Sequence, residues 1–174
     1  MDVLEAVRSG RSTSKFKPMP VPEQKIQAVF NAVRLAPSAE NRQPWRFILV
    51  SDQDLKAKVQ GAVKNAHSRV FMDAPFAVVA CARLDEAEAT VGGYMNSYPV
   101  DLGMALAHLT LAATSEGLGT CWVFAFSEDK VKAALRIPAE VRVVGLTPLG
   151  FPESLGPSEG RKHLHEILRY NNYE

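Results

Sequence analysis

The chain has few cysteines, almost no net charge and no long apolar run. Cys81 and Cys121 both lie in apolar, strand-like stretches and form no C-x-x-C pair, so we expect reduced core thiols rather than a zinc site. A formal net charge of +1 excludes the long-range field of a strongly basic nucleic-acid binder. The longest apolar run, residues 76–82, is far below the ~20 residues that span a bilayer.

Several familiar motifs are also missing. There is no Walker A sequence, and Gly117-x-Gly119 lacks the third glycine of a dinucleotide-binding turn. His163 and His165 are spaced so that a helix would direct their rings to different faces, and we therefore expect no metal site. No signal peptide opens the sequence. We expect a cytoplasmic protein with no nucleic-acid or membrane partner.

The length and hydrophobic content suit one domain over residues 1–174. At 47% hydrophobic residues, 174 residues build one well-packed core and are short for two. Asp2 followed by Glu5 predicts a capped first helix, and Pro22 predicts the first turn of a second. Apolar patterns predict strands at 46–51, 76–82, 120–126 and 142–150, and a helix near 54–66.

A longer helix is predicted from about residue 98 to 116. Its apolar residues spread round the helix instead of forming one stripe, which indicates burial on most sides. Gly117 is well placed to end it. The helix is therefore either central to the fold or covered in part by another subunit.

Polar side chains gather on a proline-bounded turn that precedes an apolar strand. Ser38, Asn41 and Gln43 lie between Pro37 and the strand-like stretch that starts near Trp45. Such a turn is either a capped connection or a loop that holds a ligand, and the residues alone leave both interpretations open.

The stretch PSAENRQPWRF, residues 37–47, resembles the PSxxNxQPWxF signature of the nitroreductase family. Members of this family are FMN-dependent enzymes that reduce nitroaromatics, quinones and flavins with NADH or NADPH. Three further segments are similar to family motifs and follow in the same order, so that the resemblance covers Asp2 to about Tyr170. They are GRSTSKF at 10–16, GLGTCW at 117–122 and RKHLHEIL at 161–168.

The resemblance implies an α+β fold with a mostly antiparallel central sheet flanked by helices. It also implies an intertwined homodimer with two flavins at the interface. A C-terminal segment, about residues 152–174, is then expected to be exchanged with the partner subunit.

The same resemblance implies which residues bind FMN. The phosphate is expected at Arg11, Ser12, Ser14, Lys15 and Arg161. The ring is expected near Pro37, Ser38 and Asn41, which reach the flavin of the other subunit, with Gln43 supporting their loop. Backbone N–H groups of Phe124 and Ala125 would face flavin N5, and His67 its pyrimidine edge. Gly10 and Ser14 replace usual basic residues, which predicts a lower FMN affinity than in typical members.

The predicted function is FMN-dependent transfer of hydride from NADH or NADPH to a small nitroaromatic, quinone or flavin acceptor. Because the flavin carries the hydride, no catalytic acid–base pair is expected in the protein. Two alternatives remain. The chain resembles members that fragment flavin or remove halide reductively, or it is a flavin-binding or regulatory module with little turnover. Residues 85–97 form a short, glycine-containing flap, where Tyr94 and the following Tyr98 are candidates to cover the ring.

Overall fold

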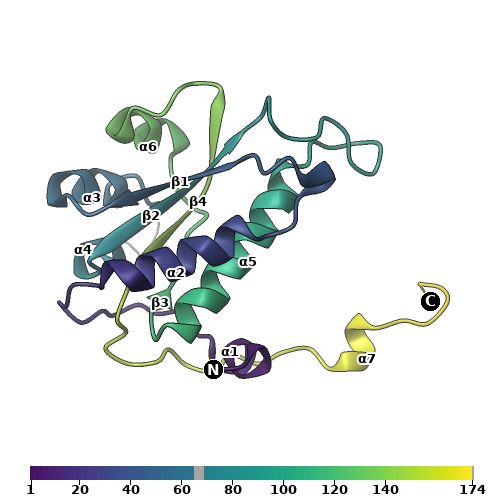
Figure 1. The fold of residues 1–174 in the computed structure, drawn as a ribbon, viewed down its shortest axis with the longest axis horizontal. Helices are drawn as coiled ribbons and strands as arrows, with labels where there is room; N and C mark the ends of the chain where they lie inside the picture. The colour runs from purple at the N-terminus through teal and green to yellow at the C-terminus, as the bar shows by residue number, and fades with distance from the viewer. Residues whose placement is uncertain (65–68, 174) are drawn as a thin grey trace.

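The chain folds as a four-stranded antiparallel sheet with helices on both faces (Figure 1). The computed structural model describes residues 1–64 and 69–173. Its sheet order is β1-β2-β4-β3, and this confirms the predicted α+β class and the antiparallel sheet. The strands are β1 (Trp45–Val50), β2 (Phe76–Arg83), β3 (Gly119–Thr120) and β4 (Val141–Gly150).

Helices cover the two faces unequally. α2 and α5 pack on one face, whereas α3, α4 and α6 pack on the other, and two short helices lie near the chain ends (Figure 1). Among the described residues the helices are α1 (Val3–Ser9), α2 (Glu23–Arg34), α3 (Gln53–Gln60), α4 (Val70–Asp73), α5 (Tyr98–Ser115), α6 (Glu128–Leu135) and α7 (Leu164–Ile167), with a 3-10 turn, η1 (Ala39–Asn41).

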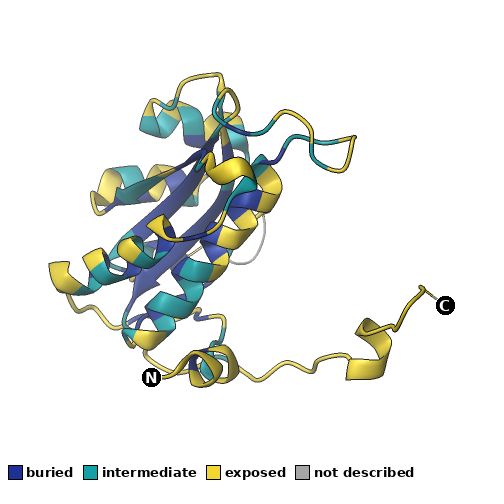
Figure 2. Cartoon of the chain, turned by 45° about the vertical axis from the view of Figure 1, so that its right-hand side comes forward, coloured by how far each residue is buried: buried dark blue, intermediate teal, exposed yellow. Residues whose placement is uncertain are grey.

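The central strand β2 divides the interior into two cores. Successive side chains of a strand point to opposite faces. Val78, Ala80 and Ala82 therefore join the core under α2 and α5, whereas Val79 and Cys81 join the core under α3, α4 and α6. All five side chains are at most 1% exposed. The dark strands between the two helical layers in Figure 2 are this doubly covered sheet.

Helix α5 confirms the predicted long helix and its stop. Gly117 has a φ of +73°, which suits the residue after a helix end, and the Leu118 N–H donates to the Ala113 carbonyl at 2.7 Å. One side of α5 is fully buried in the first core. On another side, Val100 and Met104 remain 41% and 39% exposed. The helix is thus central to this chain and also leaves an apolar edge uncovered by it.

The strand predicted at 120–126 is wrong in length. β3 ends at Thr120 because the next N–H, that of Cys121, donates to the side-chain hydroxyl of Thr147 instead of a ladder carbonyl. Beyond it, only isolated bridges continue the pairing, at Val123 and Phe126. The helix predicted over 54–66 is also shorter and ends at Gln60.

The C-terminal segment leaves the body of the molecule after β4. Residues 157–173 are all exposed, and Figures 1 and 2 show this arm extending away with α7 on it. Apolar side chains of the arm, such as Leu164 and Ile167, are 67% and 68% exposed. Among the described helices, none is both long and apolar enough to cross a membrane.

Residues 85–97 close a short turn before α5. Val91 N–H donates to the Met95 carbonyl at 2.7 Å, and Tyr94 at the tip is 82% exposed. Tyr98 instead begins α5 and packs against the core under α2 and α5. Of the two tyrosines, only Tyr94 is free to reach beyond its own chain.

Candidate functional site

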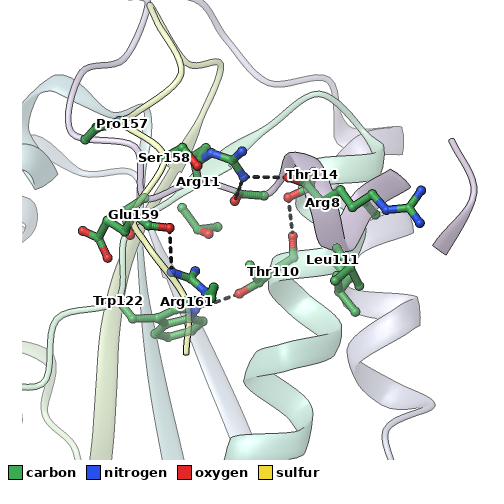
Figure 3. Close-up of a pocket in the computed structure, with 15 residues that line it drawn as sticks. Arg8, Arg11, Thr110, Leu111, Thr114, Trp122, Pro157, Ser158, Glu159 and Arg161 are labelled. Atoms are coloured by element: carbon green, nitrogen blue, oxygen red, sulfur yellow. Dashed lines mark hydrogen bonds between the residues drawn. The ribbon is translucent and has the colours of Figure 1, made fainter. Parts of the chain in front are cut away.

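A cavity of about 550 Å³ lies between α1, the C-terminal half of α5 and the start of the C-terminal arm. We call it the basal cavity. Arg11 and Ser12 enter it just after α1, and Arg161 enters from the arm, so that opposite ends of the sequence meet there (Figure 3). The other lining residues are Ala6, Val7, Arg8, Gly10, Thr110, Leu111, Thr114, Thr120, Trp122, Pro157, Ser158 and Glu159.

The two guanidinium groups that face the basal cavity are only partly engaged. Arg11 donates through Nη1 to the carbonyls of Arg8 and Gly10, at 2.7 and 2.8 Å. Arg161 donates through Nη1 to the carbonyls of Glu159 and Gly160. Within residues 1–64 and 69–173 neither side chain forms an ion pair, and the remaining N–H groups have no acceptor. Two cations with free donors at one cavity favour an anionic ligand.

Other charges at the basal cavity do not cancel this preference. Figure 3 shows the side chain of Glu159 directed away from the Arg161 guanidinium, whereas the Glu159 carbonyl faces it. Arg8 also lines the cavity, but its side chain extends away from Arg11 and Arg161 in the same view.

The segment that carries Arg11 and Ser12 is held between two other parts of the chain. Thr13 N–H donates to the Thr120 carbonyl at 2.8 Å, and Lys17 N–H donates to the Phe151 carbonyl at 2.8 Å. Thr13 is 1% exposed and lies against Gly119, where an added Cβ would come within 2.3 Å of its hydroxyl oxygen. The backbone of this segment is therefore fixed before any ligand arrives.

Two further residues expected at the phosphate lie outside the basal cavity. Ser14 and Lys15 are exposed and are not among the residues that line it. The Lys15 carbonyl accepts a hydrogen bond from Glu153 N–H at 3.0 Å. Within this single chain, Arg11, Ser12 and Arg161 are thus the members of the expected phosphate set that the structure brings together.

Trp122 forms one wall of the basal cavity and begins an aromatic surface. Its Nε1–H donates to the hydroxyl of Thr110 on α5 at 2.8 Å. Its ring stacks on that of Phe124, with ring centroids 6.3 Å apart and an interplanar angle of 20°. Phe124 is 62% exposed, so one aromatic face is open beside the cavity. Thr110 was not expected from the sequence, because it looks there like an ordinary helix residue and only the fold shows its hydrogen bond to the Trp122 indole.

Backbone donors lie beside this aromatic surface. Phe124 and Ala125 follow the irregular end of β3, and within the described chain neither N–H donates to another residue. The Val123 carbonyl, which shares a peptide with Phe124 N–H, accepts from Leu146 N–H at 3.0 Å, and the Ala125 carbonyl accepts from Lys64 N–H at 2.9 Å. Among the described residues both N–H groups therefore lack an acceptor, and hydrogen bonds fix the backbone on either side of them.

A second cavity, of about 290 Å³, lies at the other end of α5. We call it the loop cavity. Pro37, Ser38 and Ala39 line one side of it, and Asp101 and Met104 of α5 line the other. The basal cavity meets α5 at Thr110, Leu111 and Thr114. The two groups of expected flavin residues therefore lie at opposite ends of one helix within a single chain.

The loop beside the loop cavity has an unusual backbone that its own side chains support. Asn41 and Gln43 have positive φ values of +56° and +52°, as does Glu40 at +47°. Ser38 Oγ accepts from Gln43 N–H at 3.0 Å, and Gln43 Nε2 donates to the Asn41 carbonyl at 2.8 Å. Positive φ is uncommon outside glycine and marks a strained, specified turn. Asn41 and Gln43 do not line the loop cavity.

Asp101 anchors this loop and was not expected from the sequence. Its carboxylate is 1% exposed and accepts from Ala39 N–H at 2.8 Å and from the Ser97 hydroxyl at 2.6 Å. Ser97 Oγ in turn accepts from Glu88 N–H at 2.8 Å. These hydrogen bonds join the loop, α5 and the flap. In the sequence, an acidic residue in the first turn of a helix indicates only ordinary capping.

Three further expectations concern histidines and a cysteine. His67 lies outside the described residues. The prediction that His163 and His165 face apart is wrong: their rings stack with centroids 5.5 Å apart, because His163 is the non-helical residue before α7 and helical spacing does not apply. Cys121 beside Trp122 is buried, and burial raises the pKa of its thiol. This thiol therefore stays protonated and packs as an apolar group.

Comparison with known proteins gives one consistent family. The sequence profile described as Nitroreductase family matches residues 7–69 and 62–151. A Methanothermobacter thermautotrophicus protein named putative NADH dehydrogenase/NAD(P)H nitroreductase is 33% identical over 156 residues, which is 87% of this chain and 78% of that protein.

Solved structures agree in fold. A nitroreductase family protein from Clostridium novyi NT is 36% identical and superposes with a TM-score of 0.84, covering 88% of this chain and 86% of the other. A Clostridium difficile R20291 protein described as an FMN-dependent nitroreductase is 20% identical, with a TM-score of 0.84 over 98% of this chain and 99% of the other, which shows likeness of fold alone.

Proposed function

The chain belongs to the nitroreductase family, and from that premise we propose that it is an FMN-dependent NAD(P)H oxidoreductase that works as a homodimer. The observation that carries the proposal is the meeting of Arg11 and Arg161 at one cavity, with free donors and no carboxylate partner among the described residues. Relatives named NAD(P)H nitroreductase and FMN-dependent nitroreductase support the choice of cofactor and reductant.

The residues at the basal cavity suit the phosphate of FMN. A buried phosphate needs charge-assisted hydrogen bonds in place of its lost hydration. Arg11 and Arg161 supply two guanidinium forks, and Ser12 supplies a hydroxyl and a backbone amide at the same wall. Ser14 lies two residues after Ser12 on the same segment and does not line the cavity. Lys15 adds positive charge nearby without lining the cavity.

The surface beside the basal cavity suits the flavin ring. The open face of Phe124 offers an apolar, flat contact, and the free N–H groups of Phe124 and Ala125 offer donors to a ring nitrogen. His67 remains a proposed contact to the pyrimidine edge. Trp122, fixed by Thr110, separates the phosphate end from this surface.

A homodimer would bring the two cavities together. Within one protomer the loop of Pro37, Ser38, Asn41 and Gln43 is at the opposite end of α5 from the phosphate residues. We propose that this loop serves the flavin of the partner. The exposed apolar edge of α5 and the exposed apolar side chains of the C-terminal segment support a partner that covers both. This segment, about residues 152–174, includes the arm and would be the exchanged part of a single domain.

Bound FMN supplies hydride transfer between NAD(P)H and a small electron acceptor. The side chains described here bind and orient: the arginines hold the phosphate, backbone N–H groups fix the ring, and Asp101 keeps the ring loop in place. The proposed reaction requires no acid–base pair from the protein. The proposed acceptors are nitroaromatics, quinones and free flavins.

Anaerobic reduction of the FMN-loaded protein tests the proposed function. The protein is loaded with FMN, dialysed and titrated with NADH and then NADPH while the visible spectrum is recorded. Bleaching by either nucleotide, followed by recovery with a quinone, is the expected result. Retained colour that neither nucleotide bleaches would favour a flavin-binding module with little turnover, and no retained colour would contradict the assignment of the phosphate site.

A further inference from the structure

Gly156 lies close to the backbone of Ser12 at the start of the exposed C-terminal arm. Between Glu153 and Tyr173 it is the only residue that is not exposed. Its neighbours Leu155 and Pro157 both face solvent. The chain is therefore more covered at this residue than at either neighbour.

The close contact between residue 156 and Ser12 requires a residue without a side chain. A Cβ added at Gly156 would lie 2.2 Å from the carbonyl oxygen of Ser12 and 3.3 Å from its carbonyl carbon. Real Cβ atoms do not approach oxygen so closely, and the obstructing atoms are backbone, which cannot rotate away. Gly156 does not have a positive φ, so close approach and not backbone conformation sets the requirement.

The contact at Gly156 decides where the next residues lie. Pro157, Ser158 and Glu159 follow it along the wall of the basal cavity, and Arg161 ends that wall. The Cβ of Arg11 is also near, 3.8 Å from the added atom. The two arginines therefore face one cavity because the chain can lie directly on the backbone of Ser12.

We infer that Gly156 is a positioning residue for the phosphate site: its close contact with Ser12 sets Arg161 opposite Arg11. This inference rests on the proposed FMN site. A side chain at 156 would lift the arm from Ser12 and move Arg161 out of reach, without touching the cofactor itself.

The rest of the fold should tolerate that displacement. Phe16 pairs with Pro152, and Glu153 N–H donates to the Lys15 carbonyl at 3.0 Å, so the segment is anchored upstream of Gly156. Downstream of it the arm is exposed. A substitution at 156 should therefore change the placement of residues 157–161 and leave both cores intact.

The test compares Gly156→Ala with Gly160→Ala. Gly160 lies on the same exposed stretch, and an added Cβ there meets nothing within 4 Å. Dissociation constants for FMN and for riboflavin are measured by titration of flavin fluorescence. Riboflavin has the same ring and no phosphate, so it reports the ring site alone. We expect G156A to raise the FMN dissociation constant at least tenfold and to change that of riboflavin less than twofold, whereas G160A changes neither.

A second comparison asks whether Gly156 acts through Arg161. In the wild-type background Arg161→Ala should weaken FMN binding, and in the G156A background the same substitution should add little. Equal losses in both backgrounds would overturn the inference. So would FMN affinity within twofold of wild type in G156A, an equal loss for FMN and riboflavin, or a G156A variant that does not fold.

The wild-type titration separates this inference from the proposed function. Wild-type protein that binds neither flavin contradicts the proposed FMN site itself. Wild-type protein that binds FMN, together with an unaffected G156A variant, contradicts only the role of Gly156.

Discussion

The buried carboxylate of Asp101 on α5 accepts a 2.8 Å hydrogen bond from the backbone N–H of Ala39, at the centre of the proposed flavin loop. The same carboxylate accepts from the Ser97 hydroxyl. Asp101→Ala should therefore lower the free energy of unfolding by about 2–4 kcal/mol, because a buried hydroxyl and a partly buried backbone N–H lose their acceptor. Urea denaturation followed by circular dichroism measures this loss.

Asp85→Ala is the matched control for Asp101→Ala. Asp85 pairs with Arg83 at the surface, and its side chain is 60% exposed. Removal of such an exposed pair should lower the free energy of unfolding far less than removal of the Asp101 carboxylate. Equal losses in the two variants would show that Asp101 does not anchor the loop.

The buried Lys56 should make the free energy of unfolding depend on pH in the alkaline range. It is 1% exposed, its ammonium donates to the Ala74 carbonyl, and burial lowers its pKa below the ordinary 10.5, with Asp73 opposing this in part. The unfolded chain then holds the proton to higher pH than the folded one, so stability rises as pH increases through the folded pKa towards 10.5. Wild type should gain stability relative to Lys56→Met between pH 7 and pH 10.

The control for Lys56 lies on the same helix. Lys58 is exposed, so Lys58→Met should leave the same pH dependence as in wild type. Urea unfolding at both pH values gives the comparison. If the free energy of unfolding changed equally with pH in wild type and in Lys56→Met, the lowered pKa of Lys56 would be contradicted.

Both thiols should be unreactive in the folded protein. Cys81 is 1% exposed, and burial raises its pKa to about 12. Burial also raises the pKa of Cys121. Because the thiolate is the reactive form, DTNB at pH 8 should titrate no thiol within minutes in native protein and two in denaturant. One fast equivalent in the native protein would show that one of these cysteines is accessible.

The arm should hold the proposed dimer together. A chain ending after Lys162 keeps Arg161 and removes α7 with its exposed Leu164 and Ile167. Light scattering after gel filtration should show a dimer for the full chain and a lower mass for the truncated one. A chain that lacks only residues 173–174 is the control and should remain dimeric. An unchanged mass after truncation at 162 would exclude the arm as the main dimer contact.

The sequence predicted most of the framework because its two most buried elements are recognisable from their length and apolar content. The run at 76–82 is apolar on both faces and became the central strand β2, and the scattered apolar residues of 98–116 became α5. Asp2 caps α1 through Glu5 N–H as predicted. Helix α6 was not predicted, because with eight residues it buries chiefly Val131 and has only a short periodic signal.

The parts that local patterns could not give depend on tertiary contacts. β3 stops at Thr120 because the N–H of Cys121 donates to the hydroxyl of Thr147, 26 residues further along the chain. Asp101 and Thr110 matter through partners on other segments, Ala39 and Trp122. The resemblance named Arg11 and Arg161 together, but only the folded chain shows that they share a cavity, and one protomer still leaves the loop residues at the other end of α5.

The most direct test of the account is FMN and riboflavin affinity in wild type, Arg161→Ala and Lys162→Ala. Lys162 is the adjacent cation and does not line the basal cavity. A charge-assisted contact to phosphate is worth about 1.5–3 kcal/mol, or roughly a ten- to hundredfold change in affinity. R161A should weaken FMN by that factor and leave riboflavin unchanged, with K162A like wild type. FMN affinity in R161A equal to that of wild type would contradict the phosphate site and the function built on it.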